Sequence, residues 1–94
     1  MGKSVPTFRR ELDRIESEWK KFRKALRSDE RESFDELFMK AKKHASAAQY
    51  QANPDPMESV LLSMILEQQM EIDRLKRKIG DESRMVEEKV LEED

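Results

Sequence analysis

The sequence predicts an all-α protein, an antiparallel three-helix bundle with a long third helix and an acidic C-terminal tail. Apolar residues recur at alternating spacings of three and four, as on one face of a helix. Charged residues make up 43% of the 94 residues and there are only two glycines, which is typical of long helices. Turn-forming residues around Ser28 and Pro54 divide the chain, so we expect helices over about residues 5–27, 30–50 and 56–79 within one domain of residues 1–80.

The first predicted helix has the most regular apolar pattern. Its apolar residues follow steps of 3, 4, 3, 4, 3 and 4 and therefore form one narrow stripe: Val5, Phe8, Leu12, Ile15, Trp19, Phe22 and Leu26. Pro6 suits the first turn, where its missing N–H would be unpaired in any case.

The second predicted helix carries acidic residues early and lysines late, an order that complements the helix dipole. Its apolar face begins with bulky residues and ends with alanines, so a neighbouring helix could approach closely near its C-terminal end: Phe34, Leu37, Phe38, Ala41, Ala45 and Ala48. Tyr50 lies off this face. Either the helix ends before Tyr50, or the ring packs on a partner or on the start of the third helix.

The third predicted helix begins at a strong start signal, with Asp55 as an acidic cap and Pro56 in the first helical position. Gly80 is placed to end it. Between them, apolar residues and one glutamine keep the 4, 3, 4, 3, 4 rhythm of a coiled-coil seam: Leu61, Ile65, Gln68, Ile72, Leu75 and Ile79. The acidic tail at 81–94 is expected to be a frayed helix, to be flexible, or to pack on a partner.

The first half of the third helix is too apolar for two neighbouring helices to cover easily. Its apolar residues occupy about two thirds of the circumference at about 100° per residue: Met57, Val60, Leu61, Leu62, Met64, Ile65 and Leu66. We expect a second copy of the chain to cover the excess, although the first two helices could straddle the third and hide it all. The residues expected to mediate self-association are Leu62, Leu66, Gln68, Ile72 and Leu75. Gln68 could set the register by amide pairing, or it could reach solvent at the edge of the seam.

The sequence offers no recognisable catalytic, cofactor-binding or metal-binding motif. His44 is the only histidine, and a metal site would need several ligands to converge on it. Glu67 and Glu71 stand one helical turn apart, a spacing that many exposed helices share. No glycine-rich phosphate loop is present. We expect a protein that is not an enzyme, with no cofactor and with structural roles for His44, Glu67 and Glu71.

A basic run at residues 20–27 supports an alternative hypothesis of nucleic-acid association. The candidate phosphate contacts are Lys20, Lys21, Lys24 and Arg27. These residues scatter around the helix, however, and bases near the end of a helix also favour its dipole. A solvated helix end is therefore the preferred interpretation of the run.

Charge and composition narrow the expected setting. The net charge is −2, divided between +4 for residues 1–54 and −6 for residues 55–94, which gives no strong general attraction to nucleic acid or anionic lipid. No cysteine is present, which fits a reducing compartment. No apolar run approaches the ~18 residues of a membrane span, and the first residues lack the apolar core of a signal peptide. We expect a cytoplasmic protein with no membrane association.

Several short segments resemble a family of short, uncharacterised archaeal all-helical proteins. The resemblance covers roughly residues 5–79 and rests on core residues and helix starts: Phe8-Arg9-Arg10-Glu11-Leu12, Trp19 with Phe22-Arg23-Lys24-Ala25-Leu26, Phe34-Asp35-Glu36-Leu37-Phe38, His44-Ala45, and Pro56 with Leu61-Leu62-Ser63-Met64-Ile65-Leu66-Glu67. It implies an archaeal, cytoplasmic setting and supplies no site residues, because that family has no established activity.

Together these observations favour a non-enzymatic helical protein-interaction module that self-associates through the third helix. We expect a homo-oligomer, with a dimer favoured, and leave room for a different protein partner. The sequence does not indicate the biological process.

Overall fold

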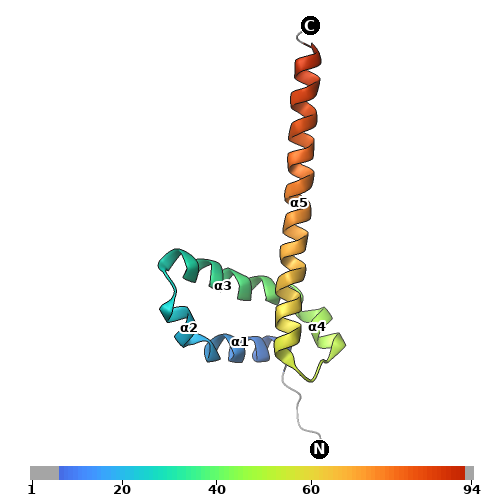
Figure 1. Ribbon diagram of the computed structural model, residues 1–94. Helices are drawn as coiled ribbons and strands as arrows, with labels where there is room; N and C mark the ends of the chain where they lie inside the picture. The colour runs from blue at the N-terminus through green and yellow to red at the C-terminus, as the bar shows by residue number, and fades with distance from the viewer. Residues whose placement is uncertain (1–6, 93–94) are drawn as a thin grey trace, which may run out of the picture.

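The computed structural model describes residues 7–92, and this part of the chain is all-α (Figure 1). Its helices are α1 (Phe8–Glu18), α2 (Lys20–Ala25), α3 (Ser28–Lys42), α4 (Ala45–Gln51) and α5 (Pro56–Glu92). The prediction of an all-α protein is confirmed. Within residues 7–92, no helix combines the length and apolarity needed to cross a bilayer.

The helices form a flat head and a long arm. We use "head" for residues 7–55, in which α1 and α3 run antiparallel and are joined through α2 (Figure 1). The arm is α5, which packs against α1, α3 and α4 with its first half and then projects away from them. The overall dimensions are 76 × 35 × 14 Å. Because α5 runs across the head rather than alongside it, the antiparallel three-helix bundle expected from the sequence is not confirmed.

The first predicted helix is broken at Trp19. The Trp19 backbone has φ −99° and ψ 18°, and its N–H donates to the carbonyls of both Ile15 and Glu16 at 3.2 Å. The break turns α2 so that Phe22 reaches Phe34 of α3, with ring centroids 5.8 Å apart. The predicted apolar stripe therefore divides: Phe8, Leu12 and Ile15 are buried, whereas Trp19 and Phe22 are half exposed.

The second predicted helix begins at Ser28 rather than about residue 30, and it is broken at Lys43 and His44. The N–H groups of these two residues donate to Lys40 and Ala41 over a three-residue span, the tighter pattern common at helix ends. The backbone then restarts as α4, which contains Tyr50. The second predicted helix therefore ends before Tyr50, at Lys42, which is one of the alternatives expected for it, and the Tyr50 ring in α4 is 94% exposed.

One hydrophobic core joins all the longer elements of the head to the base of α5. Its buried members are Phe8, Leu12 and Ile15 of α1, Phe38 and Ala41 of α3, Ala45 of α4, and Val60 and Met64 of α5. The small side chains of Ala41 and Ala45 lie at the α3–α4 break, where they leave room for α5. The close approach predicted from the alanine-rich end of the second segment is thus found here.

The predicted start of α5 is confirmed. The Asp55 carboxylate accepts the N–H of Met57 at 3.0 Å, and Pro56 occupies the first helical position. Just before this turn, α4 ends at Ala52, which has the left-handed backbone conformation at φ 51°. This conformation reverses the chain direction over four residues and brings α5 back onto the head.

The predicted end of the third helix at Gly80 is wrong. Helix α5 continues through Gly80 to Glu92, so residues 81–92 of the acidic segment are helical. A glycine within a helix costs only about 0.8–1.0 kcal/mol relative to alanine, so it does not have to end the helix. A Cβ built at Gly80 would meet no neighbouring group within 4 Å beyond the adjacent helical backbone. Val5 and Pro6, assigned to the first helix, and the last two residues of the tail lie outside the described residues.

Gly80→Ala should stabilise α5, because alanine in a helix interior is favoured over glycine by about 0.8–1.0 kcal/mol. We expect higher helical content and a higher melting temperature by circular dichroism at matched protein concentration. Whether Gly80→Ala raises or lowers stability therefore distinguishes a glycine within the helix from one that ends it. If Gly80 instead ended the helix in a left-handed conformation, the same substitution would lower stability.

Candidate self-association surface

One face of α5 is committed to the head. Val60, Ser63, Met64 and Glu67 are the buried residues of this helix, and they recur at steps of three, one and three. They form a single stripe because about 3.6 residues complete one turn. This stripe fixes which sides of α5 remain available to other molecules.

The predicted seam lies about a quarter turn away from that stripe and is exposed. Its residues are Leu61, Ile65, Gln68, Ile72, Leu75 and Ile79, and every one of them is exposed. Ile72 and Leu75 retain 47% and 58% of their accessible surface. The apolar line also extends beyond the predicted helix end to Val86 and Val90, which are 61% and 59% exposed. The sequence analysis did not include these two residues in the seam because it predicted that the helix ends at Gly80.

Leu62 and Leu66 lie on a third side of α5 rather than on the seam. Leu62 follows Leu61 by one residue and is therefore rotated from it by about 100°. Both leucines border a groove between α4 and α5 that His44 and Ala48 also line. They are 67% and 45% exposed, so the head does not shelter them. Of the five residues assigned to self-association, Gln68, Ile72 and Leu75 share a face, and Leu62 and Leu66 form a neighbouring one.

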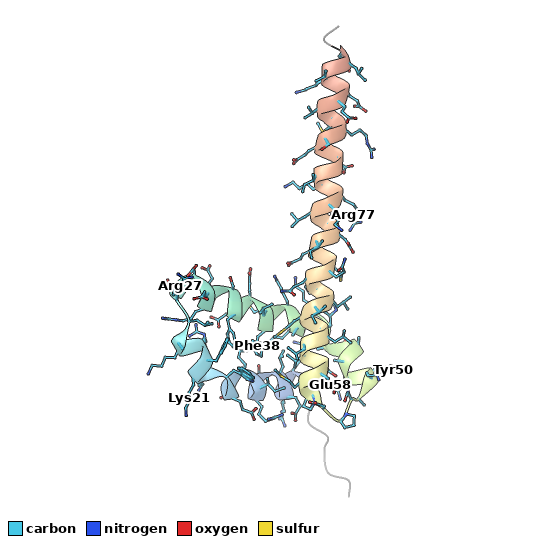
Figure 2. The ribbon with its side chains drawn as sticks, in the orientation of Figure 1. Lys21, Arg27, Phe38, Tyr50, Glu58 and Arg77 are labelled. Carbon is cyan, nitrogen blue, oxygen red and sulfur yellow. The ribbon has the colours of Figure 1, made fainter. Side chains whose placement is uncertain are left out.

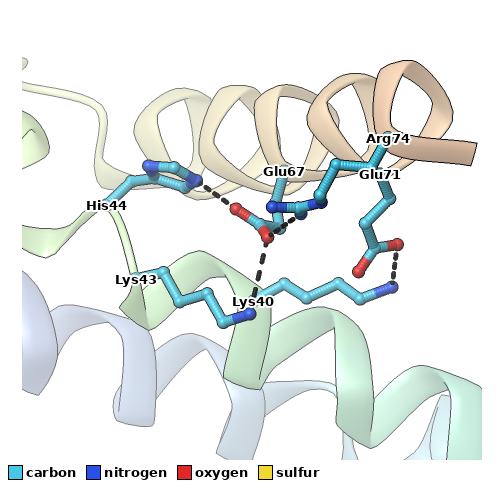
Figure 3. A network of polar contacts seen from close by, with 6 residues as sticks. All are labelled: Lys40, Lys43, His44, Glu67, Glu71 and Arg74. Atoms are coloured by element: carbon cyan, nitrogen blue, oxygen red, sulfur yellow. Dashed lines mark hydrogen bonds and ion pairs between the residues drawn. The ribbon is translucent and has the colours of Figure 1, made fainter. Parts of the chain in front are cut away.

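A buried carboxylate holds α5 on the head (Figure 3). The Glu67 side chain is only 3% exposed, and its Oε2 lies 2.9 Å from His44 Nε2. Its Oε1 accepts from Arg74 Nη2 at 3.0 Å and from Lys43 Nζ at 3.4 Å. The break between α3 and α4 is what brings Lys43 and His44 to this position. The cluster therefore joins both sides of that break to α5.

The Glu67 carboxylate is ionised in this environment. Burial favours the neutral form, but the hydrogen bonds from His44 and Arg74 and the positive charge of Lys43 outweigh it and hold the pKa of Glu67 below its usual range. An ionised carboxylate can only accept hydrogen bonds, so His44 Nε2 carries the donated proton. Within residues 7–92, no buried side-chain nitrogen or oxygen lacks a partner.

A second ion pair lies one turn further along α5. Lys40 Nζ of α3 donates to Glu71 Oε2 at 2.9 Å. The two carboxylates singled out in the sequence, Glu67 and Glu71, are thus both used to attach α5 to α3 and α4. The described residues contain no group of three or more His, Cys, Asp or Glu side chains arranged to hold a metal ion.

The basic run is dispersed among carboxylates. Lys21 and Arg27 lie at the end of the head away from α5 (Figure 2). Arg27 Nε contacts Glu30 at 3.1 Å, while Lys20 and Lys24 line a depression that also contains Asp13 and Glu16. Arg23, Arg31 and Lys42 line the same depression, together with Asp35, so its basic side chains are interspersed with carboxylates. Nucleic-acid binding stays a prediction.

Comparison with known proteins places the chain in a family. The sequence model for a domain of unknown function, DUF8156, matches residues 1–94, so the chain belongs to this family. No curated protein and no solved structure shows significant similarity to the chain.

Glu67→Gln should lower the stability of the packing between α5 and the head. It should also weaken the dependence of folding stability on pH in the acidic range. Folding lowers the pKa of Glu67. The stabilisation that the Glu67 carboxylate contributes to the folded state is therefore fully present above the ordinary glutamate pKa of about 4.3, and it is lost as the pH falls through the lower, folded-state pKa. We expect Glu67→Gln to reduce the melting temperature near pH 7 and to flatten the loss of stability below about pH 4.3.

The matched control is Glu71→Gln, because the Glu71 side chain is 38% exposed and makes a single ion pair. It should reduce the melting temperature less than Glu67→Gln does. Equal effects of the two substitutions, measured by thermal unfolding across pH, would contradict the role of Glu67 as the main polar link.

Proposed function

We propose that this DUF8156 family member is a protein-interaction module without chemistry of its own, which forms a homodimer through α5. The observation that carries the proposal is the exposed apolar seam on an arm that continues far beyond the head. Every residue from Ile72 to Glu92 is exposed, so no described part of the chain packs against this half of α5.

The energetics of isolated helices support this proposal. Most helical stability in proteins comes from packing an apolar face against other elements rather than from the helix propensity of the sequence. The distal half of α5 has 21 residues from Ile72 to Glu92 and includes a glycine. Packing of its seam against another helix would supply the missing stabilisation.

A second copy is the partner that the chain itself supplies. The seam repeats with the 3,4 spacing that lets two such helices interlock, and the same surface is present on each copy. Burying an isoleucine or leucine contributes about 1.5–3 kcal/mol, so several such residues per helix can offset the cost of association. The seam side chains are exposed in the single copy from Leu61, which is 45% exposed, to Ile79, which is 61% exposed.

Ile72→Glu should disrupt the homodimer, because it places two like charges in the middle of the apolar seam. Loss of one buried isoleucine from each copy corresponds to at least a ~100-fold rise in the dissociation constant. Sedimentation velocity or light scattering over a range of protein concentrations would measure it.

Arg77→Glu is the control, since Arg77 is exposed on the side of α5 opposite the seam and the substitution changes the charge even more. It should leave association unchanged. A wild-type protein that stays monomeric at its highest attainable concentration would contradict the proposed function and would direct attention to a different protein partner.

A further inference from the structure

We infer that the two copies of α5 associate as a parallel, in-register coiled coil, which places both heads at the same end of one rod. This inference rests on the proposed homodimer and specifies the arrangement of the partner. It follows from three features of α5: the residue types along the seam, the position of Gln68, and the side of the helix on which Leu62 lies.

The residue types alternate along the seam in a way that favours two parallel strands. In heptad notation, between Leu61 and Val86 the a positions are Ile65, Ile72, Ile79 and Val86, and the d positions are Leu61, Gln68, Leu75 and Glu82. β-Branched residues at a combined with leucine at d favour parallel dimers over larger assemblies. All the a residues are β-branched, and each of them is exposed in the single copy.

Gln68 distinguishes the parallel, in-register arrangement from the others. In a parallel pair, d residues face d residues, so Gln68 meets its own counterpart and the two amides can hydrogen-bond. An antiparallel pair sets d against a, which leaves Gln68 opposite an isoleucine or valine. A parallel pair shifted by one heptad sets it against Leu61 or Leu75. Both alternatives bury an amide without a partner, which is costly.

The residues beside the seam agree with this arrangement. Position g of one helix lies next to position e of the other, five residues later, in a parallel pair. Met57 at g then adjoins Leu62 of the second copy, and Glu71 at g adjoins Lys76. The exposed Leu62 thereby gains an apolar neighbour at the base of the other α5. Glu71 Oε2 already accepts from Lys40, and its other oxygen remains available to Lys76.

An antiparallel pair centred on the seam would give different neighbours. It would place the heads at opposite ends and bring Leu62 beside Lys76 of the second copy, because e positions then face e positions. Leu62 would stay solvated or lie against a charge. The parallel arrangement is therefore the one that covers the apolar surface next to the head.

Cysteine cross-linking separates the two orientations cleanly because the chain contains no cysteine of its own. Leu61→Cys and Ile79→Cys lie 18 residues apart, about 27 Å along the helix. A disulfide needs Cα atoms within about 7 Å. In the parallel arrangement each variant alone should form a disulfide-linked dimer in a glutathione redox buffer, and a mixture should give no link between position 61 and position 79.

The outward-facing Arg77→Cys serves as the control and should remain largely unlinked. Links between positions 61 and 79 in the mixture, without links in the separate variants, would overturn the parallel orientation while leaving the homodimer intact. Absence of all links together with a monomer in sedimentation of the same samples before oxidation would instead overturn the proposed function.

Gln68→Leu tests the part assigned to the amide. Removing a polar group from the seam should tighten association and admit species other than the in-register dimer. The readouts are sedimentation velocity and the link pattern of the same cysteine variants in this background. A variant that associates no more tightly and keeps a single species would contradict the role of Gln68 in setting the register.

Discussion

The attachment of α5 through the buried Glu67 carboxylate is the constraint on which the rest of the structure depends. A helix with apolar residues on two thirds of its circumference could pack on the head by any of several faces. Glu67 selects one, because its carboxylate must reach His44, Lys43 and Arg74 once it is removed from water. Any rotation of α5 that buried the seam instead would leave this charge buried without partners or return it to solvent. The polar cluster therefore decides which hydrophobic face is left for another molecule.

The break between α3 and α4 is what makes this cluster possible. A continuous helix would carry His44 onward with the helical rotation, whereas the tight turn at Lys43 and His44 directs both side chains to the same carboxylate. The small residues Ala41 and Ala45 on either side of the break let α5 come close enough for the contact. Local backbone geometry, close packing and charge pairing thus act at one point.

The sequence predicted the features that depend on periodicity. The 3,4 spacing of Phe8, Leu12 and Ile15 placed them correctly in the core, and the Asp55-Pro56 pair correctly marked the start of α5. It could not predict the breaks at Trp19 and His44. Neither position carries a glycine or proline, and each break is accompanied by contacts between residues distant in sequence, of Phe22 with Phe34 and of His44 with Glu67, which the local sequence does not reveal.

At Gly80 the error was the opposite one, since a helix end was predicted and the helix continues. A glycine that can end a helix can also lie within one at a modest cost. For the candidate surface, spacing assigned Leu62 and Leu66 to the excess apolar surface beside the seam, and both were expected to contact the second copy. Only the rotation of α5 set by Glu67 shows that they face the α4 groove instead.

The position of Gly80 also bears on how folding and association are coupled. Before Gly80 the seam is apolar at every position except Gln68, whereas after it charged residues interrupt the apolar line and leave Val86 and Val90 more widely spaced. In the proposed homodimer the first part would therefore supply most of the binding energy, and the second part would add less. Since the head fixes α5 through Glu67 at the other end, association would extend order outward from a rigid base. Under the proposed homodimer, a second copy would pack against the distal half of α5, and this packing would account for both its exposed length and its seam.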